Sequence, residues 1–151
     1  MLPNLKFEVL DFNQPKDVKG RTFDYIICNG ILHHLYFRLD PALATLFALL
    51  NPRGRIIFLE PNIYNPYCAF IFNYARQWAN LEPDEMAFSK GFITKKLDIA
   101  GFKNTVVDYK DFLLPGVPRI MVQPSIAIGN VLEKIPLIKM VSQSIFINAE
   151  K

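Results

Sequence analysis

The stretch 23–35, FDYIICNGILHHL, constrains the fold more than any other part of this chain. Its short apolar run, YIIC, is followed by the turn pair NG and then by two histidines. Short β-branched runs bounded by turn residues are typical of strands buried on both faces, as in parallel sheets covered by helices. Ligands bind outside the carboxyl ends of such strands. The stretch therefore predicts a ligand site at Asn29, Gly30, His33 and His34.

The remaining segments alternate between strand-like and helix-like patterns. Further strands are predicted over residues 5–12, 55–59, 104–109 and 144–149. Helices are predicted over residues 40–50, 66–78, 90–100 and 126–134. Asp40 is expected to cap the first helix, and Gly101 to end the third as a left-handed cap. Strands that alternate with helices indicate a layered α/β sheet, in which the last strand is expected to run antiparallel because no clear crossover helix precedes it.

The composition is that of a globular protein and excludes several classes. The 151 residues are enough for one domain, and 51% of them are hydrophobic. A formal net charge of +3 is too small to indicate nucleic-acid binding. No apolar run reaches the roughly 20 residues of a membrane span, and no signal-peptide pattern follows Met1. Cys28 and Cys68 lie far apart in apolar runs, which is typical of reduced core cysteines in a cytoplasmic protein.

Five pieces of the chain occur in a diagnostic order: FDYIICNGILHHL, a proline-headed helix, LNPRGRIIFLEPN, AGF and the closing SIFINAEK. Together they resemble the class I, Rossmann-like methyltransferases that depend on S-adenosylmethionine. The resemblance covers residues 5–151 and implies the C-terminal two-thirds of that fold. It implies strands 3, 4, 5, 6 and 7 of the family sheet, the last one antiparallel, with helices on both faces. The most similar pattern belongs to small-molecule enzymes that act on quinone precursors and other lipophilic acceptors.

The resemblance implies cofactor contacts at two strand ends. Asp11 matches the acid that faces the adenine amino group, with Phe12 beside the base. The plainer alternative is that Asp11 ends a strand and caps a turn. Asn29 and Gly30 match the position that lies against the methionine part of the cofactor, where glycine lets the backbone approach a ligand closely.

The histidine pair admits more than one role. His33 and His34 match an HH that often follows in the family. A neutral imidazole there can bond the cofactor carboxylate or deprotonate an acceptor hydroxyl, and a structural role is the alternative. The pair alone does not predict a metal site, because no third ligand stands at a suitable spacing.

The residues that face the acceptor are predicted to follow the strand over residues 55–59. Glu60, Asn62 and Tyr64 match the family loop that faces the acceptor, although Glu60 also fits a solvent-facing strand end. Segments 62–90 and 112–142 match those that cover the acceptor pocket, where aromatic residues suit a flat or lipophilic substrate. Ordinary packing of helices on a sheet explains the same pattern. Contact of residues 120–140 with an anionic membrane surface is a further alternative.

The chain also departs from the family pattern. It lacks the glycine-rich GxGxG motif, since no G-x-G occurs among its seven glycines. Arg53 stands where the family's LKPGG turn has its first glycine, and a positive φ there strains a non-glycine residue. Without the family's first two strands, strand 23–28 is expected to have an open apolar edge. This open edge has three explanations. Strand 5–12 pairs with it, or another chain pairs with it, as a second copy in a homo-oligomer or as a missing N-terminal half. The third explanation, which is favoured, is that the chain is a truncated enzyme.

The sequence therefore predicts methyl transfer from S-adenosylmethionine to a small, lipophilic or aromatic acceptor. The absent glycine motif supports an alternative, a non-catalytic methyltransferase remnant or partner subunit. A third hypothesis is an unrelated α/β binding module with an accidental resemblance. The strand order separates the third from the others, because the family order places strands 4, 5, 7 and 6 side by side with the last strand antiparallel.

Overall fold

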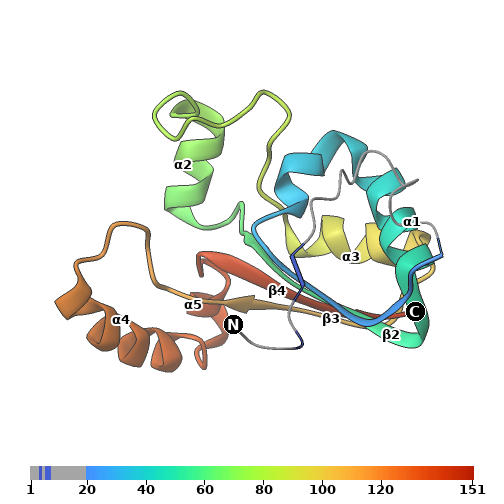
Figure 1. The fold of residues 1–151 in the computed structure, drawn as a ribbon. Coiled ribbons are helices and arrows are strands. Elements are labelled where there is room, and N and C mark those ends of the chain that lie inside the picture. The colour runs from blue at the N-terminus through green and yellow to red at the C-terminus, as the bar shows by residue number, and fades with distance from the viewer. Residues whose placement is uncertain (1–3, 5, 8–19) are drawn as a thin grey trace.

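The computed structural model describes residues 4, 6, 7 and 20–151. Its centre is a four-stranded sheet in the order β1-β2-β4-β3 (Figure 1). The strands are β1 (Phe23–Asn29), β2 (Leu50–Pro61), β3 (Lys103–Lys110) and β4 (Ser144–Glu150). β1 runs parallel to β2, whereas β4 runs antiparallel to both β2 and β3. The antiparallel last strand is thus confirmed, and this order is the family's 4-5-7-6 rather than that of an accidental look-alike.

The helices surround this sheet. In chain order they are the 3-10 helix η2 (Leu32–Arg38), α1 (Leu39–Leu49), α2 (Pro66–Tyr74), α3 (Lys90–Ile99), α4 (Arg119–Leu132) and α5 (Pro136–Lys139). The α/β fold class is therefore confirmed. The strand predicted over residues 5–12, with Asp11 and Phe12, lies largely outside the described residues, and those two side chains lie wholly outside them.

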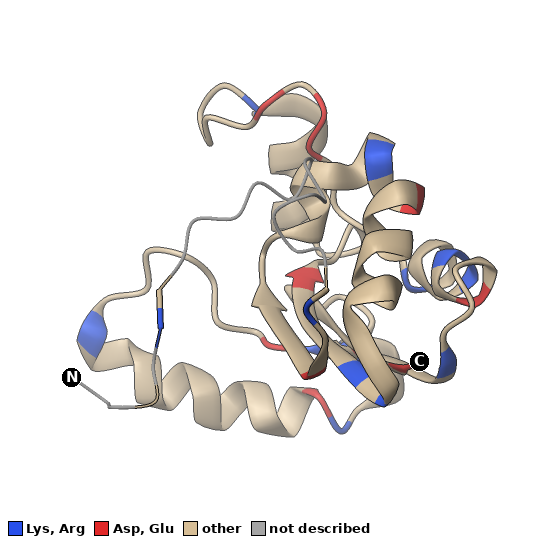
Figure 2. Ribbon diagram, turned by 45° about the vertical axis from the view of Figure 1, so that its right-hand side comes forward, with Lys and Arg blue, Asp and Glu red and all other residues tan. Residues whose placement is uncertain are grey.

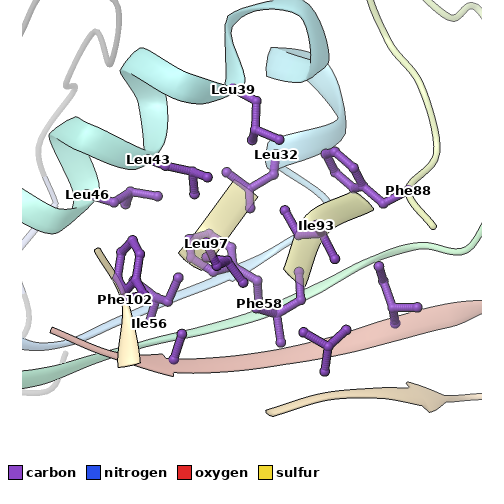
Figure 3. Close-up of a cluster of buried hydrophobic side chains, with 14 of the residues drawn as sticks. Leu32, Leu39, Leu43, Leu46, Ile56, Phe58, Phe88, Ile93, Leu97 and Phe102 are labelled. Atoms are coloured by element: carbon purple, nitrogen blue, oxygen red, sulfur yellow. The ribbon is translucent and has the colours of Figure 1, made fainter. Parts of the chain in front are cut away.

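The main core lies between one face of the sheet and the helices α1 and α3 (Figure 3). Ile56 and Phe58 of β2 are almost fully buried there, against side chains that include Leu43, Ile93 and Leu97. Alternate residues of a strand point to opposite faces. On the opposite face Tyr25 and Ile27 of β1 are 61% and 70% exposed, so the described residues leave that part of the sheet uncovered. The prediction that this strand is buried on both faces is therefore wrong for the described part of the chain.

Several predicted helix boundaries are wrong, each for a local reason. η2 runs directly into α1, so the N-cap is Arg38, and Asp40 lies in the first turn instead, where a carboxylate still favours the helix dipole. α2 ends at Tyr74, four residues before the predicted end. α4 begins at Arg119 and continues past Pro124, although proline removes a helical hydrogen bond. Gly101 ends α3 with a φ of 93°, as predicted.

The segment that matches the family's LKPGG turn is an irregular start of β2, which begins at Leu50. Arg53 has a φ of 65°, so it occupies the left-handed region that disfavours a bulky side chain. Gly54 is required by space: a Cβ there would lie 2.9 Å from the carbonyl oxygens of both Asn51 and Phe23. Glycine therefore allows β1 and β2 to approach closely at this point.

Two helices follow strands that end at the same edge of the sheet: α2 follows β2, and α4 follows β3 (Figure 1). Figure 2 shows that α4 carries charge only at its ends, at Arg119 and at the adjoining Glu133. Along its length Ile120, Ile128 and Val131 are exposed. No helix in the described part of the chain has both the length and the apolar character to span a membrane.

Candidate functional site

The site lies at the carboxyl ends of β1 and β2, the parallel pair of the sheet. Gly30 follows β1 with a φ of 63°, and its N–H donates to the carbonyl of Leu59 in β2 over 2.8 Å. This positive φ is the conformation that glycine adopts most readily. The turn sends the chain directly into η2, whose first residues lie over the end of β2. As predicted from the sequence, the histidine pair is thereby brought to the strand ends.

Glu60 organises this turn from inside the protein. Its side chain is fully buried, and its carboxylate accepts the backbone N–H groups of Ile31 and Leu32 (3.0 and 2.8 Å) and of His33 (3.2 Å). The first N–H groups of a helix have no intrahelical partner, so a carboxylate there satisfies them and complements the helix dipole. The alternative that Glu60 is a solvent-facing strand end is therefore wrong.

The same carboxylate orients His33. The ring Nδ1 of His33 lies 3.0 Å from Oε2 of Glu60, and His33 is only 9% exposed. An ionised carboxylate only accepts hydrogen bonds, so the neutral ring in this pair carries its proton on Nδ1. The lone pair is then on Nε2, the nitrogen that faces away from Glu60. A base oriented by a buried carboxylate is a recurring arrangement in enzymes.

A second histidine–carboxylate pair lies beside the first. The Nδ1 of His34 lies 2.7 Å from Oε1 of Glu85, and the two histidine rings have their centroids 4.1 Å apart. Glu85 is buried, whereas the side chain of His34 is 51% exposed. Oε2 of Glu85 is buried and has no hydrogen-bond partner among the described residues. One ligand atom from each of His33, His34 and Glu85 lies within 4.8 Å of the others.

Glu85 is held in place through its backbone. The guanidinium of Arg76 donates to the carbonyl of Glu85 over 2.9 Å, and it also donates to the carbonyl of Glu82. The next residue, Met86, donates its N–H to the carbonyl of His33 over 3.1 Å. The segment that carries Glu85 is thus fastened both to the end of α2 and to η2.

A pocket of ≈ 230 Å³ opens beside these strand ends. Its lining combines the strand-end residues Asn29, Gly30 and Glu60 with α2 side chains, and adds Pro115 and Gln143 from the C-terminal half. The apolar contribution of α2 comes from Tyr67, Cys68, Ile71 and Phe72. Burial raises the pKa of the Cys68 thiol to about 11, so this cysteine is inert at neutral pH. Both Cys68 and Cys28 are free thiols, as predicted.

Asn62 and Tyr64 differ in burial. Asn62 is fully buried: its amide donates to the carbonyls of Met140 and Ser142, and its Oδ1 accepts the N–H of Tyr64 over 3.1 Å. It thereby fastens the chain that leads into β4 to the end of β2. The Tyr64 ring, in contrast, is 53% exposed.

Comparison with known proteins assigns the family. A family model described as "Methyltransferase domain" matches residues 1–96, which is more than half of the chain. The chain belongs to this methyltransferase domain family. The predicted family is therefore confirmed, and S-adenosylmethionine is the co-substrate of the methyltransferases that share its fold.

Other similarities agree with this assignment. "Probable polyketide synthase 30" of Dictyostelium discoideum is 25% identical over 144 residues, which are 84% of this chain and 5% of that protein. The methyltransferase domain thus spans about a twentieth of the length of such curated relatives. A methyltransferase of Archaeoglobus fulgidus described as SAM-dependent has a similar fold, with a TM-score of 0.62, 17% identity and coverage of 93% of this chain and 64% of that one. The CurJ carbon methyltransferase has a TM-score of 0.55, 21% identity and coverage of 93% and 33%.

The methyltransferase site holds one functional candidate that sequence reasoning missed. Glu85 lies 51 positions beyond its partner His34, in a segment that reads as a polar loop. No spacing rule connects residues so far apart. The only local signal is that apolar Met86, Ala87 and Phe88 follow it, which indicates a segment that returns to the core.

Proposed function

We propose that this methyltransferase domain transfers the methyl group of S-adenosylmethionine to a carbon atom of an acyl substrate, with His33 as the general base. The observation that carries the proposal is the buried hydrogen bond between His33 and Glu60 at the carboxyl ends of the parallel strands. A base is most needed when the nucleophile is a carbon, because a C–H group must lose its proton before carbon can attack.

The chemistry fits the geometry of the pair. A C–H group between two carbonyls is acidic enough for an imidazole to deprotonate it, and the resulting enolate carbon attacks the sulfonium methyl. The C–H proton passes to Nε2 of His33, the new C–C bond forms as the S–C bond breaks, and S-adenosylhomocysteine leaves. Glu60 stabilises the imidazolium that forms and holds the ring in its orientation. Because the sulfonium is already reactive, the rest of the protein's work is positioning.

The cofactor side of the proposal uses the first strand end. Asn29 and Gly30 line the pocket, and Gly30 allows backbone to lie close to the methionine part of the cofactor. His34 is exposed beside His33 and is available to the cofactor carboxylate. The adenine contacts of Asp11 and Phe12 stay predictions, since those residues lie outside the described part of the chain.

The acceptor side uses the two cover segments, 62–90 and 112–142. Support comes from the pocket lining, to which the first segment contributes Tyr67 and Phe72 and the second contributes Pro115. This apolar wall suits a lipophilic acceptor. Tyr64 is exposed and available for an acceptor contact, whereas the buried Asn62 acts by fastening the chain before β4.

The acceptor class is proposed from two relatives. The similarity to a polyketide synthase supports a β-ketoacyl thioester, and the structural similarity to a carbon methyltransferase supports methylation at carbon. Such a thioester carries the acidic C–H group that the His33–Glu60 pair suits. The free cysteines suit a reducing compartment, and we place the protein in the cytoplasm.

The test is an assay of the full chain with acetoacetyl-pantetheine and methyl-labelled S-adenosylmethionine. We expect labelled product with the methyl on the carbon between the carbonyls, identified by NMR. His33→Gln is expected to lower the rate by about 100-fold or more. The matched control is Glu82→Gln, a neighbouring exposed acid, which is expected to leave the rate unchanged. Methylation of the enol oxygen, or full activity of His33→Gln, contradicts the proposal.

A non-catalytic partner subunit is the second candidate, because the chain contains no G-x-G motif. Among the described residues β1 pairs with β2 alone, and its exposed Tyr25 and Ile27 suit pairing with another chain. Calorimetric titration with S-adenosylhomocysteine separates the two candidates. Heat of binding together with turnover supports the enzyme, whereas no heat at millimolar ligand supports the partner subunit.

A further inference from the structure

We propose that His33, His34 and Glu85 form a binding site for a divalent transition-metal ion of the zinc type. One ring nitrogen of each histidine and one carboxylate oxygen of Glu85 lie within 4.8 Å of one another. Two imidazole nitrogens and one carboxylate oxygen form a ligand set that zinc uses in catalytic sites, with the fourth position left to water or a ligand. Imidazole ligands favour zinc, copper and nickel over magnesium or calcium, which prefer oxygen.

The second carboxylate oxygen of Glu85 is an independent indication of a ligand. Within the described part of the chain Oε2 is buried and has no hydrogen-bond partner, although the other oxygen pairs with His34 over 2.7 Å. Leaving a buried acceptor unpaired is costly, so such groups in proteins are nearly always satisfied. A cation bound by Glu85 through Oε2 would give this oxygen a partner.

The surroundings of the three ligands match those of metal sites. A metal-bound histidine usually donates its other ring N–H to a carboxylate, and Glu60 takes this position on Nδ1 of His33. That contact leaves Nε2 of His33 for the ion. Arg76 fixes the backbone of Glu85, so two of the three ligands are held in place before an ion arrives.

The third ligand, His34, must move when the ion binds. Ligands at 2.0–2.1 Å around a tetrahedral ion lie roughly 3.3 Å apart, so the His34–Glu85 contact of 2.7 Å must open and the cluster must contract. His34 is half exposed and is free to rotate without disturbing the core. The ion then takes the place of the hydrogen bond that His34 and Glu85 now make.

The site has a consequence for the proposed reaction, and this consequence alone rests on the proposed function. Nε2 of His33 cannot hold a metal ion and accept a substrate proton at the same time. A bound ion is therefore expected to inhibit methyl transfer, and a chelator to restore it. Metal binding itself does not depend on the identity of the acceptor, so the binding experiment stands apart from the activity assay.

The test is titration of the untagged full chain with Co²⁺, followed by visible absorption. We expect one Co²⁺ per chain with the intense d–d bands of four-coordination, and displacement of Co²⁺ by Zn²⁺. Glu85→Gln and His34→Gln are each expected to weaken binding by at least about 100-fold, the upper end of the loss seen for residues outside the ligand shell. Glu82→Gln, which removes an exposed acid near the site, is expected to bind Co²⁺ as the wild type does.

Two results would overturn the site. The first is an absorption spectrum of Co²⁺ that stays that of the hydrated ion at millimolar protein. The second is a Glu85→Gln or His34→Gln variant that binds with wild-type affinity. Far-ultraviolet circular dichroism checks that each variant is folded, and the side chain of His34 is half exposed, so its replacement disturbs the core less than that of Glu85. If Co²⁺ binds but does not inhibit an active enzyme, the site stands and the assignment of His33 as the base fails.

Discussion

The two histidine–glutamate pairs of this domain differ in how well their carboxylates are satisfied. Glu60 accepts three backbone N–H groups and the ring of His33, and no part of its side chain is exposed. Glu85 accepts from one ring nitrogen of His34, and its second oxygen is buried with no partner in residues 4, 6, 7 and 20–151. Neighbouring histidines in one helix thus have different environments because their partners come from different parts of the chain.

This difference indicates that the Glu60 carboxylate has a structural role, whereas the Glu85 carboxylate can bind a further ligand. A carboxylate with four donors is part of the scaffold, and it holds His33 in one orientation. A carboxylate with an unpaired oxygen is ready for another ligand. The contrast between Glu60 and Glu85 therefore predicts different effects of substitutions at the two pairs.

The largest effect is expected in proton exchange at the acceptor carbon. With acetoacetyl-pantetheine in deuterated water and no methyl donor, the domain is expected to catalyse exchange of the acidic C–H group. His33→Gln is expected to slow this exchange by about 100-fold, because the base is lost. His34→Gln is expected to slow it by less than about tenfold, because its ring is oriented toward Glu85 instead.

Proton NMR measures the exchange in both variants. Equal losses in His33→Gln and His34→Gln would show that the two pairs act as one unit. A larger loss in His34→Gln would reverse the assignment of the base.

A smaller effect is expected in the free energy of unfolding. Glu60→Gln places an N–H₂ group where backbone N–H donors converge, so it is expected to lower the stability by about 3 kcal/mol. Glu85→Gln alters one partly buried contact and leaves the other buried position without a partner, as in the wild type, so its cost is expected to stay under about 1 kcal/mol. Urea denaturation at one temperature measures both. Similar losses for the two variants would contradict the contrast between the pairs.

The smallest effect is expected at Cys28, which lies next to this network. Burial raises the pKa of the Cys28 thiol, and the negative charge of Glu60 raises it further. Removing that charge in Glu60→Gln lowers the pKa toward its ordinary value, so more thiolate is present at pH 8. Alkylation by iodoacetamide is then expected to accelerate by roughly threefold.

Mass spectrometry of the folded variants, at a temperature well below unfolding, measures alkylation of each cysteine. Cys68 is the internal control, because its pKa is raised to about 11 by its own burial. Glu85→Gln is the matched control, because Glu85 does not contribute to the pKa shift of Cys28. Acceleration in Glu85→Gln equal to that in Glu60→Gln would assign the effect to loosening rather than to charge.

The sequence by itself predicted the elements that depend on local patterns. Strands such as Phe23–Asn29 are recognisable as short apolar runs. Gly101 is recognisable as a helix end because glycine adopts a positive φ more easily than other residues. The order of these elements was enough to predict the family, and it also predicts at which edge of the sheet ligands would bind. Helix ends were less predictable: α1 begins at Leu39 because η2 feeds into it, which no cap residue announces.

Only the tertiary structure decided what the polar residues at that edge do. Glu60 looked like a strand end open to solvent, and it became the buried acceptor of a helix terminus because η2 folds back over β2. Nothing in the sequence connects Glu85 with His34; the two residues meet because the chain after α2 returns to η2. Hydrophobic periodicity depends on residues that are close in the sequence, so it can be predicted locally. The partner of a buried charge depends on the path of the whole chain, so it cannot.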